Sequence, residues 1–330
     1  MKEFIISIDL GGTKILSALI NEKKEIVSRE KVATKFKKGP QQLVKDIVES
    51  VHMLFEKTGV GEDKIRAICL GVPGTVNPIT GVIGNAPNLE IKNYNIKKAL
   101  QKHFNIPVLI ENDVNLGGLG IKKYEMHDKV NNMLVVFVGT GIGGALFFDG
   151  KIYRGTSFFA GEIGHMLVSP EGLLLGAKKK TTFEGIASRT AIVKAIQKDI
   201  KAGKKSAITE LLGDKKAIKS KTLLQAMLKK DKVVTTQINY ASKVIGTVLG
   251  SLVTLLNIDT IVLGGGVIEA MGKYMLPIIK KEFDKAVLPE PGKILKLVAT
   301  KLGDDAALYG GLALADEFGD LQNVEEETNE

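Results

Sequence analysis

Two glycine-rich turns, Asp9-Leu-Gly-Gly-Thr-Lys14 and Gly139-Thr-Gly-Ile-Gly-Gly144, decide how this sequence is interpreted. Each turn follows an apolar run, beginning at Phe4 and at Met133, and leads into a second apolar run. Glycine lets backbone N–H groups approach a phosphate because no Cβ stands in the way. Either turn alone is explained equally well as a tight hairpin. Their repetition at the head of two similar units predicts a polyphosphate held from both sides, as in a nucleotide-dependent transferase.

The second turn also matches G-x-G-x-x-G, the dinucleotide-binding fingerprint, which must open a helix after its strand. Here the chain continues into Ala145-Leu-Phe-Phe148 and the pair Asp149-Gly150, a pattern typical of a hairpin. A dinucleotide site is therefore disfavoured. The sequence also lacks the G-x-x-x-x-G-K-[ST] motif of P-loop kinases.

Size and composition are those of a globular protein with more than one domain. A chain of 330 residues with 44% hydrophobic content is too long for one ordinary core, so two domains are expected. The net charge of +9 comes mostly from lysines spread along the chain, not from arginines clustered on one element. With 5% aromatic residues and no Trp, the sequence predicts no nucleic-acid surface.

The remaining composition signals concern cysteine and targeting. The single cysteine, Cys69, lies in the apolar run 65–72 and is interpreted as a buried thiol rather than a nucleophile. The N-terminus shows no signal-peptide pattern, and no apolar stretch approaches the length of about 18 residues that a membrane span needs. We therefore expect a cytoplasmic protein that does not cross a membrane.

Strands alternate with helices along the chain, which indicates an α/β protein. Apolar periodicity predicts strands at 4–10, 14–21, 26–33, 65–72 and 108–111 around a helix at 43–55, with the stretch before Tyr94 as a loop. The second part repeats the three-strand opening at 133–138, 145–148 and 151–154. It continues with helices near 183–200, 221–228, 233–256, 268–283 and 306–318, and strands at 260–263 and 295–299. The repeat predicts two similar halves.

Two further features fit a nucleotide. Asp9 ends a buried strand and points into its turn, and an acid beside a phosphate requires a cation, so we assign Asp9 to a water-mediated Mg²⁺ contact. An Asx-turn is the alternative. Leu263-Gly-Gly-Gly-Val267 ends a strand and starts a helix, and its glycines allow a ribose or a flat ring to lie against the backbone. This predicts an adenosine site, although a strand-to-helix turn needs glycine in any case.

The acceptor chemistry is predicted from Glu111-Asn-Asp-Val-Asn115, which stands between a strand and a helix. Asp and Asn are good helix N-caps, and capping alone explains either residue. A carboxylate at the carboxyl end of a strand also faces the region where α/β proteins bind ligands. Asp113 is therefore interpreted as a general base that takes the proton from a hydroxyl attacking the γ-phosphorus.

A second polar pair lies between small residues in Phe159-Ala-Gly-Glu-Ile-Gly-His165. A structural role is the more common one for a lone histidine such as His165. Together, Glu162 and His165 supply the acceptor and donor that a sugar hydroxyl needs. We interpret them as a clamp for ring hydroxyls.

Taken together, these motifs resemble the ROK family (repressor, open reading frame, kinase) of bacterial sugar kinases, within the actin-like ATPase superfamily. The resemblance covers essentially the whole chain. It is carried by eight segments in order: Asp9–Lys14, Gly71–Gly74, Ala86–Asn88, Glu111–Asp113, Gly139–Gly144, Ala160–His165, Phe183-Glu184 and Leu263–Gly266.

The resemblance implies an α/β fold of two RNase-H-like domains with a central cleft, in a homodimer. We expect an N-terminal domain of residues 1–117 plus about 305–322, a C-terminal domain of 118–304, and a disordered tail at 323–330. It further implies that Asp113 is the catalytic base. The implied sugar contacts are Gly74, Asn88, Asn112, Asp113, Glu162, His165 and Glu184. The implied ATP contacts are Asp9, Gly11, Gly12, Thr13, Lys14, Gly139, Thr140, Gly141, Gly264, Gly265 and Gly266.

The sequence departs from the family in one segment. Most members carry three cysteines there, which bind a structural zinc together with the histidine. In this chain those positions fall on Leu175, Ala177 and Thr182, none of which ligates zinc. We expect no zinc, leaving His165 as a sugar partner only, with packing of Leu173–Leu175 holding the loop.

The expected activity is therefore ATP-dependent phosphorylation of a hexose at its 6-hydroxyl, with glucose as the first candidate. Because zinc-free members act on several sugars, mannose, fructose, N-acetylmannosamine and N-acetylglucosamine remain alternatives, and so does polyphosphate as donor. Family repressors carry a winged helix before the first strand. Here that strand begins at Phe4, so a sugar-sensing regulator would have no such DNA reader.

Overall fold

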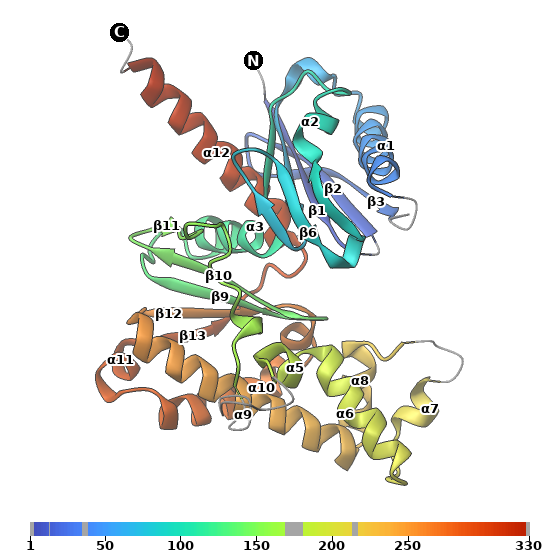
Figure 1. Cartoon of the computed structure of the whole chain (residues 1–330), viewed down its shortest axis with the longest axis vertical. Helices are drawn as coiled ribbons and strands as arrows, with labels where there is room; N and C mark the ends of the chain where they lie inside the picture. The colour runs from blue at the N-terminus through green and yellow to red at the C-terminus, as the bar shows by residue number, and fades with distance from the viewer. Residues whose placement is uncertain (1–2, 13, 35–38, 169–180, 213–216, 328–330) are drawn as a thin grey trace. The chain divides into compact units, whose positions relative to one another are not determined.

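The computed structural model describes residues 3–12, 14–34, 39–168, 181–212 and 217–327. Its contacts divide the chain into two compact units, whose elements are labelled in Figure 1. Unit 1 comprises residues 1–129, 152–160 and 304–330, and unit 2 comprises 130–151 and 161–303. Unit 1 thus extends past the boundary expected after residue 117. There α3 (Asp113–Gly120) continues directly into the π-helical turn η4 (Ile121–Glu125), and both pack on the last helix.

Unit 1 contains a five-stranded sheet in the order β3-β2-β1-β4-β8. The strands are β1 (Phe4–Leu10), β2 (Lys14–Asn21), β3 (Ile26–Ala33), β4 (Ile65–Val72) and β8 (Val108–Asn112). β1, β2 and β3 pair antiparallel, whereas β4 is parallel to both β1 and β8. The predicted strands in this unit are confirmed almost to the residue.

Helices cover both faces of this sheet. Successive side chains of a strand point to opposite faces, so Ile6 and Ile8 join the core under α1 (Pro40–Thr58) while Ser7 faces α12 (Asp305–Glu327). Figure 1 shows α1 and α12 on opposite sides of the sheet. Cys69 is fully buried, and burial raises the pKa of its thiol to about 12, as expected for an unreactive cysteine.

The prediction of a loop before Tyr94 is wrong in part. It forms a small antiparallel sheet of β5 (Thr75–Asn77), β6 (Val82–Ala86) and β7 (Ile91–Asn95), with the single turn η3 (Pro87–Leu89) between the last two. Its buried residues Val76, Ile83 and Ile91 each stand among partly exposed or polar neighbours, which masked the strand pattern. A short helix, α2 (Ile96–Leu100), follows.

Unit 2 repeats the sheet of unit 1 in the order β11-β10-β9-β12-β13. Its strands are β9 (Met133–Val138), β10 (Ile142–Phe148), β11 (Lys151–Ile152), β12 (Thr260–Gly264) and β13 (Lys296–Ala299). β9 and β10 are antiparallel, whereas β12 is parallel to both β9 and β13. The same strand order and directions in both units confirm the predicted pair of similar α/β halves.

The helices of unit 2 build a large apolar core against this sheet. They are α5 (Phe183–Ala187), α6 (Arg189–Lys201), α7 (Ile208–Leu212), α8 (Ser220–Leu228), α9 (Lys232–Leu256), α10 (Gly266–Ala286) and α11 (Pro289–Ile294). The helix predicted at 183–200 is split at Ser188, because the side chain of Ser188 caps a new helix by accepting a hydrogen bond from Ala191 N.

Two long helices bear on the sequence expectations. By length and a mean hydropathy of 1.2, α9 is long and apolar enough to cross a membrane. Yet 56% of its apolar window is buried within the protein, as in the core helix of a globular domain. The last helix runs from Asp305 to Glu327, so the described part of the expected tail, up to Glu327, is helical.

Candidate functional site

The register of three parallel strands brings the acidic residues of unit 1 to one sheet edge. Asp9 of β1 lies opposite Gly71 of β4, and Gly71 lies opposite Glu111 of β8. The first glycine-rich turn leaves this edge after β1 and closes with a hydrogen bond of 2.9 Å from Gly11 N to Lys14 O. The turn and the Glu111–Asp113 corner therefore belong to the same end of the sheet.

The first turn carries a lysine, Lys14, and an acid with a raised pKa, Asp9. Burial raises the pKa of Asp9 to about 6, which the nearby Lys14 partly opposes. The Lys14 ammonium lies 3.3 Å from Oδ2 of Asp304. A Cβ built on Gly12 would lie 3.6 Å from the Cβ of Asn88, so the first turn touches a residue expected to bind sugar. Thr13 lies outside the described residues.

In the corner after β8, the residue that caps α3 is Asn112 and not Asp113. Oδ1 of Asn112 accepts hydrogen bonds from Val114 N at 2.9 Å and Asn115 N at 3.0 Å, which makes Asn112 the N-cap of α3. Its Nδ2 donates to the carbonyl of Gly74 at 3.0 Å. The side chain of Asn112 is thus engaged within the protein, and it ties the corner to Gly74.

Asp113, by contrast, is the first residue of α3 and not its cap. Oδ1 of this half-buried carboxylate accepts a hydrogen bond of 2.9 Å from Val114 N. Gly74 has a φ of +90°, and a Cβ there would lie 2.4 Å from the carbonyl oxygen of Asn85, so only glycine fits. The predicted acceptor residues Gly74, Asn112 and Asp113 therefore form one connected group.

Beside this group lies an ion pair that the sequence analysis did not identify. Nε of Arg154 lies 2.7 Å from Oε2 of Glu111, whose side chain is only 2% exposed. Oε1 of the same carboxylate accepts hydrogen bonds from Asn112 N and from Nδ2 of Asn115. Glu111 belongs to the motif Glu111–Asp113, but its partner Arg154 is 43 residues away in sequence. No local pattern indicates the pairing.

In unit 2 the second glycine-rich turn is shorter than predicted. Gly139 N donates to Gly141 O at 2.9 Å, and β10 already begins at Ile142. The later glycines of the motif serve strand packing, since a Cβ on Gly144 would lie 2.9 Å from the carbonyl oxygen of Gly161. A Cβ on Gly139 would meet open space, so this residue leaves room beside the turn.

Glu184 contacts this second turn directly. Its Oε2 accepts a hydrogen bond of 2.8 Å from Ile142 N. A Cβ on Gly141 would lie 2.3 Å from the same oxygen, so a side chain there would displace the Glu184 carboxylate. Thr182, at a family cysteine position, caps α5 by accepting a hydrogen bond from Gly185 N. Glu184 was expected to contact the sugar, and the structure adds a contact beside the second glycine-rich turn.

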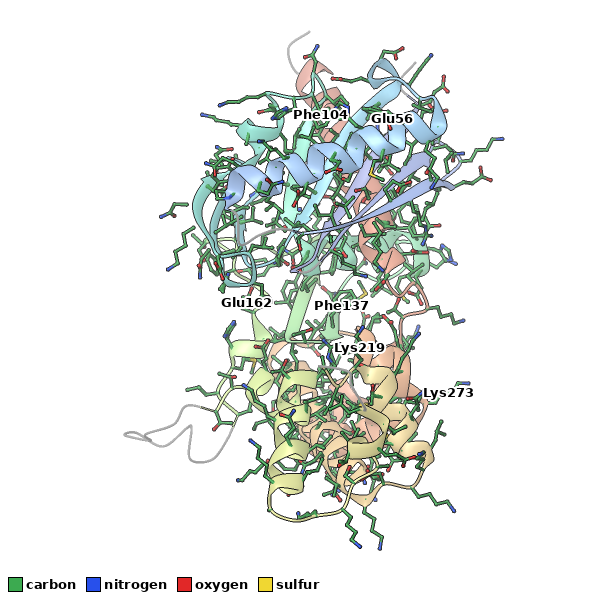
Figure 2. All side chains as sticks on the ribbon, turned by 90° about the vertical axis from the view of Figure 1, so that its right-hand side faces the viewer. Glu56, Phe104, Phe137, Glu162, Lys219 and Lys273 are labelled. Atoms are coloured by element: carbon green, nitrogen blue, oxygen red, sulfur yellow. The ribbon has the colours of Figure 1, made fainter. Side chains whose placement is uncertain are left out.

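Glu162 and His165 stand close together in unit 2, as predicted. Nε2 of His165 lies 3.6 Å from Oε2 of Glu162, and the two side chains are 72% and 42% exposed. Burial raises the pKa of Glu162, while His165 lowers it and the nearby Glu184 raises it further. Glu162 is labelled in Figure 2. These three side chains therefore form one polar cluster with accessible donors and acceptors.

The third glycine segment follows β12. Gly265 has a φ of +84°, and a Cβ there would lie within 2.9 Å of Val138 backbone atoms. A Cβ on Gly264 would lie 2.9 Å from the side chain of Thr300, whereas Gly266 begins α10 with more room. Packing thus explains Gly264 and Gly265, and no described contact tests the expected adenosine role.

The zinc prediction falls mostly on undescribed residues. Residues 169–180, which include Leu173–Leu175 and Ala177, lie outside the described ranges. Within those ranges, no group of three or more His, Cys, Asp or Glu side chains has the arrangement of a metal site. The absence of zinc stays a prediction.

Comparison with known proteins defines the class. The ROK family pattern matches residues 5–317, so the chain belongs to the ROK family. Its fold is that of the two-domain actin-like ATPases found among ROK kinase structures. The crystal structure of a ROK glucokinase from Streptomyces griseus with glucose and AMPPNP superposes with a TM-score of 0.81 at 28% identity, covering 95% of this chain and 99% of that one.

Two curated relatives are similar over nearly their whole length. A glucokinase of Halalkalibacterium halodurans is 29% identical over 307 residues, which are 93% of each chain. An N-acetylmannosamine kinase of Vibrio cholerae is 30% identical over 308 residues, 92% of this chain and 96% of its own.

Proposed function

We propose that this protein is an ATP-dependent hexose kinase that phosphorylates a 6-hydroxyl, with glucose as the first candidate acceptor. The observation that carries the proposal is the Asp113 corner, which shares a sheet edge with Asp9 and the first glycine-rich turn. A carboxylate at this edge is placed for proton transfer next to a phosphate-binding turn. The glucokinase relatives support the same activity.

In the proposed reaction, Asp113 accepts the proton of the sugar hydroxyl while that oxygen attacks the γ-phosphorus. The new oxygen–phosphorus bond replaces the bond to the β-phosphate oxygen, and ADP leaves. Backbone N–H groups of both turns stabilise charge on the phosphates. The hydrogen bond from Val114 N orients the Asp113 carboxylate.

The residues around Asp9 fit a magnesium ion carried by the nucleotide. Mg²⁺ is typically bound through one or two carboxylates, with phosphates and waters completing the shell. Asp9 supplies one carboxylate, and burial raises its pKa to about 6 because the nearby Lys14 offsets the effect of burial only in part. When bound, the ion would neutralise phosphate charge, with Asp9 contacting it through water.

For the acceptor, we propose that six further residues bind the sugar: Gly74, Asn88, Asn112, Glu162, His165 and Glu184. Asn112 would act mainly by fixing Asp113, because its side chain is occupied by the cap and by Gly74. The exposed Glu162–His165 pair offers both an acceptor and a donor to ring hydroxyls.

A panel of sugars in a coupled ADP-release assay tests this proposal. Glucose should give the highest kcat/KM, with mannose, fructose, N-acetylglucosamine and N-acetylmannosamine as competitors. The similarity to the Vibrio cholerae enzyme favours N-acetylmannosamine as the second candidate. Direct detection of sugar phosphate with polyphosphate as donor separates the two donor classes. Sugar binding without turnover in any combination would favour a sugar-sensing regulator instead.

We also propose that the protein is a homodimer located in the cytoplasm that binds neither nucleic acid nor membrane. The spread of lysines and the burial of α9 support the last two points. Light scattering after size-exclusion chromatography tests the dimer. Cell fractionation tests the location.

A further inference from the structure

The second glycine-rich turn has an arginine attached to it that the motif analysis did not identify. Nη2 of Arg189 donates a hydrogen bond of 2.6 Å to Oγ1 of Thr140. The backbone of the same residue also holds the turn, since Arg189 N donates to Gly139 O at 2.9 Å. Thr190 adds a third link, with its hydroxyl donating to Thr140 O at 2.7 Å. The turn is thereby fixed against α6.

No acid among the described residues balances the charge of this arginine. Arg189 makes no ion pair with any described carboxylate, whereas Arg29, Arg66 and Arg154 each make at least one. Its side chain is partly exposed, so the guanidinium keeps donors available. A guanidinium has five N–H donors in a planar fork, of which the bond to Thr140 uses one.

The space next to Gly139 is open in the described part of the chain. Apart from its two chain neighbours, no described residue would lie within 4 Å of a Cβ on Gly139. Gly141 differs, because there Glu184 fills the corresponding space. The turn therefore has a closed side, occupied by a carboxylate, and an open side at the residue whose carbonyl Arg189 binds. A phosphate would be repelled on the first side and attracted on the second.

We propose that Arg189 binds a phosphate group of the donor substrate, next to Thr140. This inference depends on the proposed kinase function, and it deepens that function by assigning a residue to the donor. Arginine is well suited to this role because its fork binds phosphate oxygens bidentately. The ligand is the chain of phosphates shared by ATP and inorganic polyphosphate, not the adenosine.

Calorimetric titration without sugar tests the assignment on the full-length chain. Arg189→Ala should weaken AMPPNP binding by about 10- to 100-fold, the range of a charge-assisted hydrogen bond. Binding of adenosine should stay within about twofold of wild type, because adenosine has no phosphate. Arg189→Lys should restore part of the loss. Lys194→Ala, which removes an exposed charge from the same helix, should leave the affinity for AMPPNP unchanged.

The outcomes are separable. Equal losses for adenosine and AMPPNP in Arg189→Ala, or no loss for either, would overturn the assignment. If inorganic triphosphate competes with AMPPNP in wild type but less well in Arg189→Ala, the site serves polyphosphate as well as ATP. If only AMPPNP responds, the site serves the nucleotide alone. A wild type that binds AMPPNP but phosphorylates no sugar would contradict the proposed function and leave Arg189 assigned. No AMPPNP binding by wild type would contradict both.

Discussion

Arg154 and Glu111 form a charged pair with 2.7 Å between Nε and Oε2, directly beside the residue that caps the helix of Asp113. The Glu111 carboxylate is almost fully buried, and both of its oxygens are used. Such a pair is expensive to break from one side, because the remaining charge loses its partner. We infer that it fixes the corner from which Asp113 acts.

The first prediction concerns this pair. Glu111→Gln should lower the free energy of unfolding by about 3 kcal/mol, since Arg154 loses its main charged partner. Urea denaturation measures the change. Lys280→Ala, which removes an exposed ion pair with Asp284, is the control and should change stability by less than about 1 kcal/mol. Equal effects of the two variants would contradict a structural role for the buried pair.

The second prediction concerns Asp113. Asp113→Asn should lower kcat by about 10²- to 10⁴-fold, the usual contribution of a general base. Sugar affinity should change little, because the asparagine oxygen still accepts the hydrogen bond from Val114 N. Steady-state kinetics with equilibrium sugar binding separates the two effects. Asp284→Asn, at an exposed acid, should leave kcat unaltered. Near-wild-type kcat in Asp113→Asn would reassign the base.

The strands and the turns of this protein are readable from sequence because their signals are local. The run Ile65–Val72 and the paired glycine-rich turns show their apolar pattern within a few residues. The small sheet from β5 to β7 was not readable. Its strands are short and rich in polar residues, and they are stabilised by pairing with one another.

The residues of the candidate site also divide into those with a local sequence signal and those without one. Asp113 and Glu162 were found because they stand in motifs. Arg154 and Arg189 were missed because each is more than 40 residues away in sequence from its partner. The separation is 43 residues from Glu111 and 49 residues from Thr140, respectively. Similarly, the capping role of Asn112 depends on hydrogen-bond geometry, which the residue types alone left open.

The third prediction concerns pH. Burial raises the pKa of Asp9 from 3.8 to about 6, so the folded state favours the neutral acid more than the unfolded state does. Its contribution to stability is therefore present below about pH 4 and is lost as the pH rises through about 6. Asp9→Asn should become progressively more stable relative to wild type over this range, by up to about 3 kcal/mol.

Denaturation at several pH values, with a chelator and without nucleotide, measures this difference. The comparison removes the effects of other titrating groups, because they are shared by both proteins. Asp284→Asn serves as the exposed control and should show no such trend. A stability difference between Asp9→Asn and wild type that stays constant from about pH 4 to about pH 7.5 would rule out the raised pKa.

The fourth prediction concerns Glu184, which joins the Glu162–His165 pair to the second glycine-rich turn. Glu184→Ala should raise KM for both the sugar and ATP, because it removes a sugar acceptor and also releases Ile142 N. Glu184→Gln keeps an oxygen for Ile142 N, so its KM for ATP should stay closer to wild type. His165→Ala, an exposed position without a contact to the turn, should raise only the KM for sugar. An unchanged KM for ATP in Glu184→Ala would show that Glu184 does not affect ATP binding through the turn.

The fifth prediction concerns the contact between α3 and α12. A Cβ on Gly310 would lie 1.8 Å from the carbonyl oxygen of Leu116, and one on Gly120 would lie 2.0 Å from that of Ala306. Backbone approaches backbone here, so a methyl group cannot be absorbed by a side-chain rotation. Gly310→Ala should therefore destabilise the protein by about 1–3 kcal/mol or more, despite the better helix propensity of alanine.

Because α3 begins at Asp113, the same substitution should also lower kcat by displacing the base. Gly272→Ala in α10 is the matched control. Its new methyl would meet only the Ile268 side chain, at 3.3 Å, so stability should change by less than about 1 kcal/mol. If Gly310→Ala lowers stability but leaves kcat intact, the packing of α12 supports the fold without positioning Asp113. If it changes neither, α3 and α12 do not approach as closely as the structure shows.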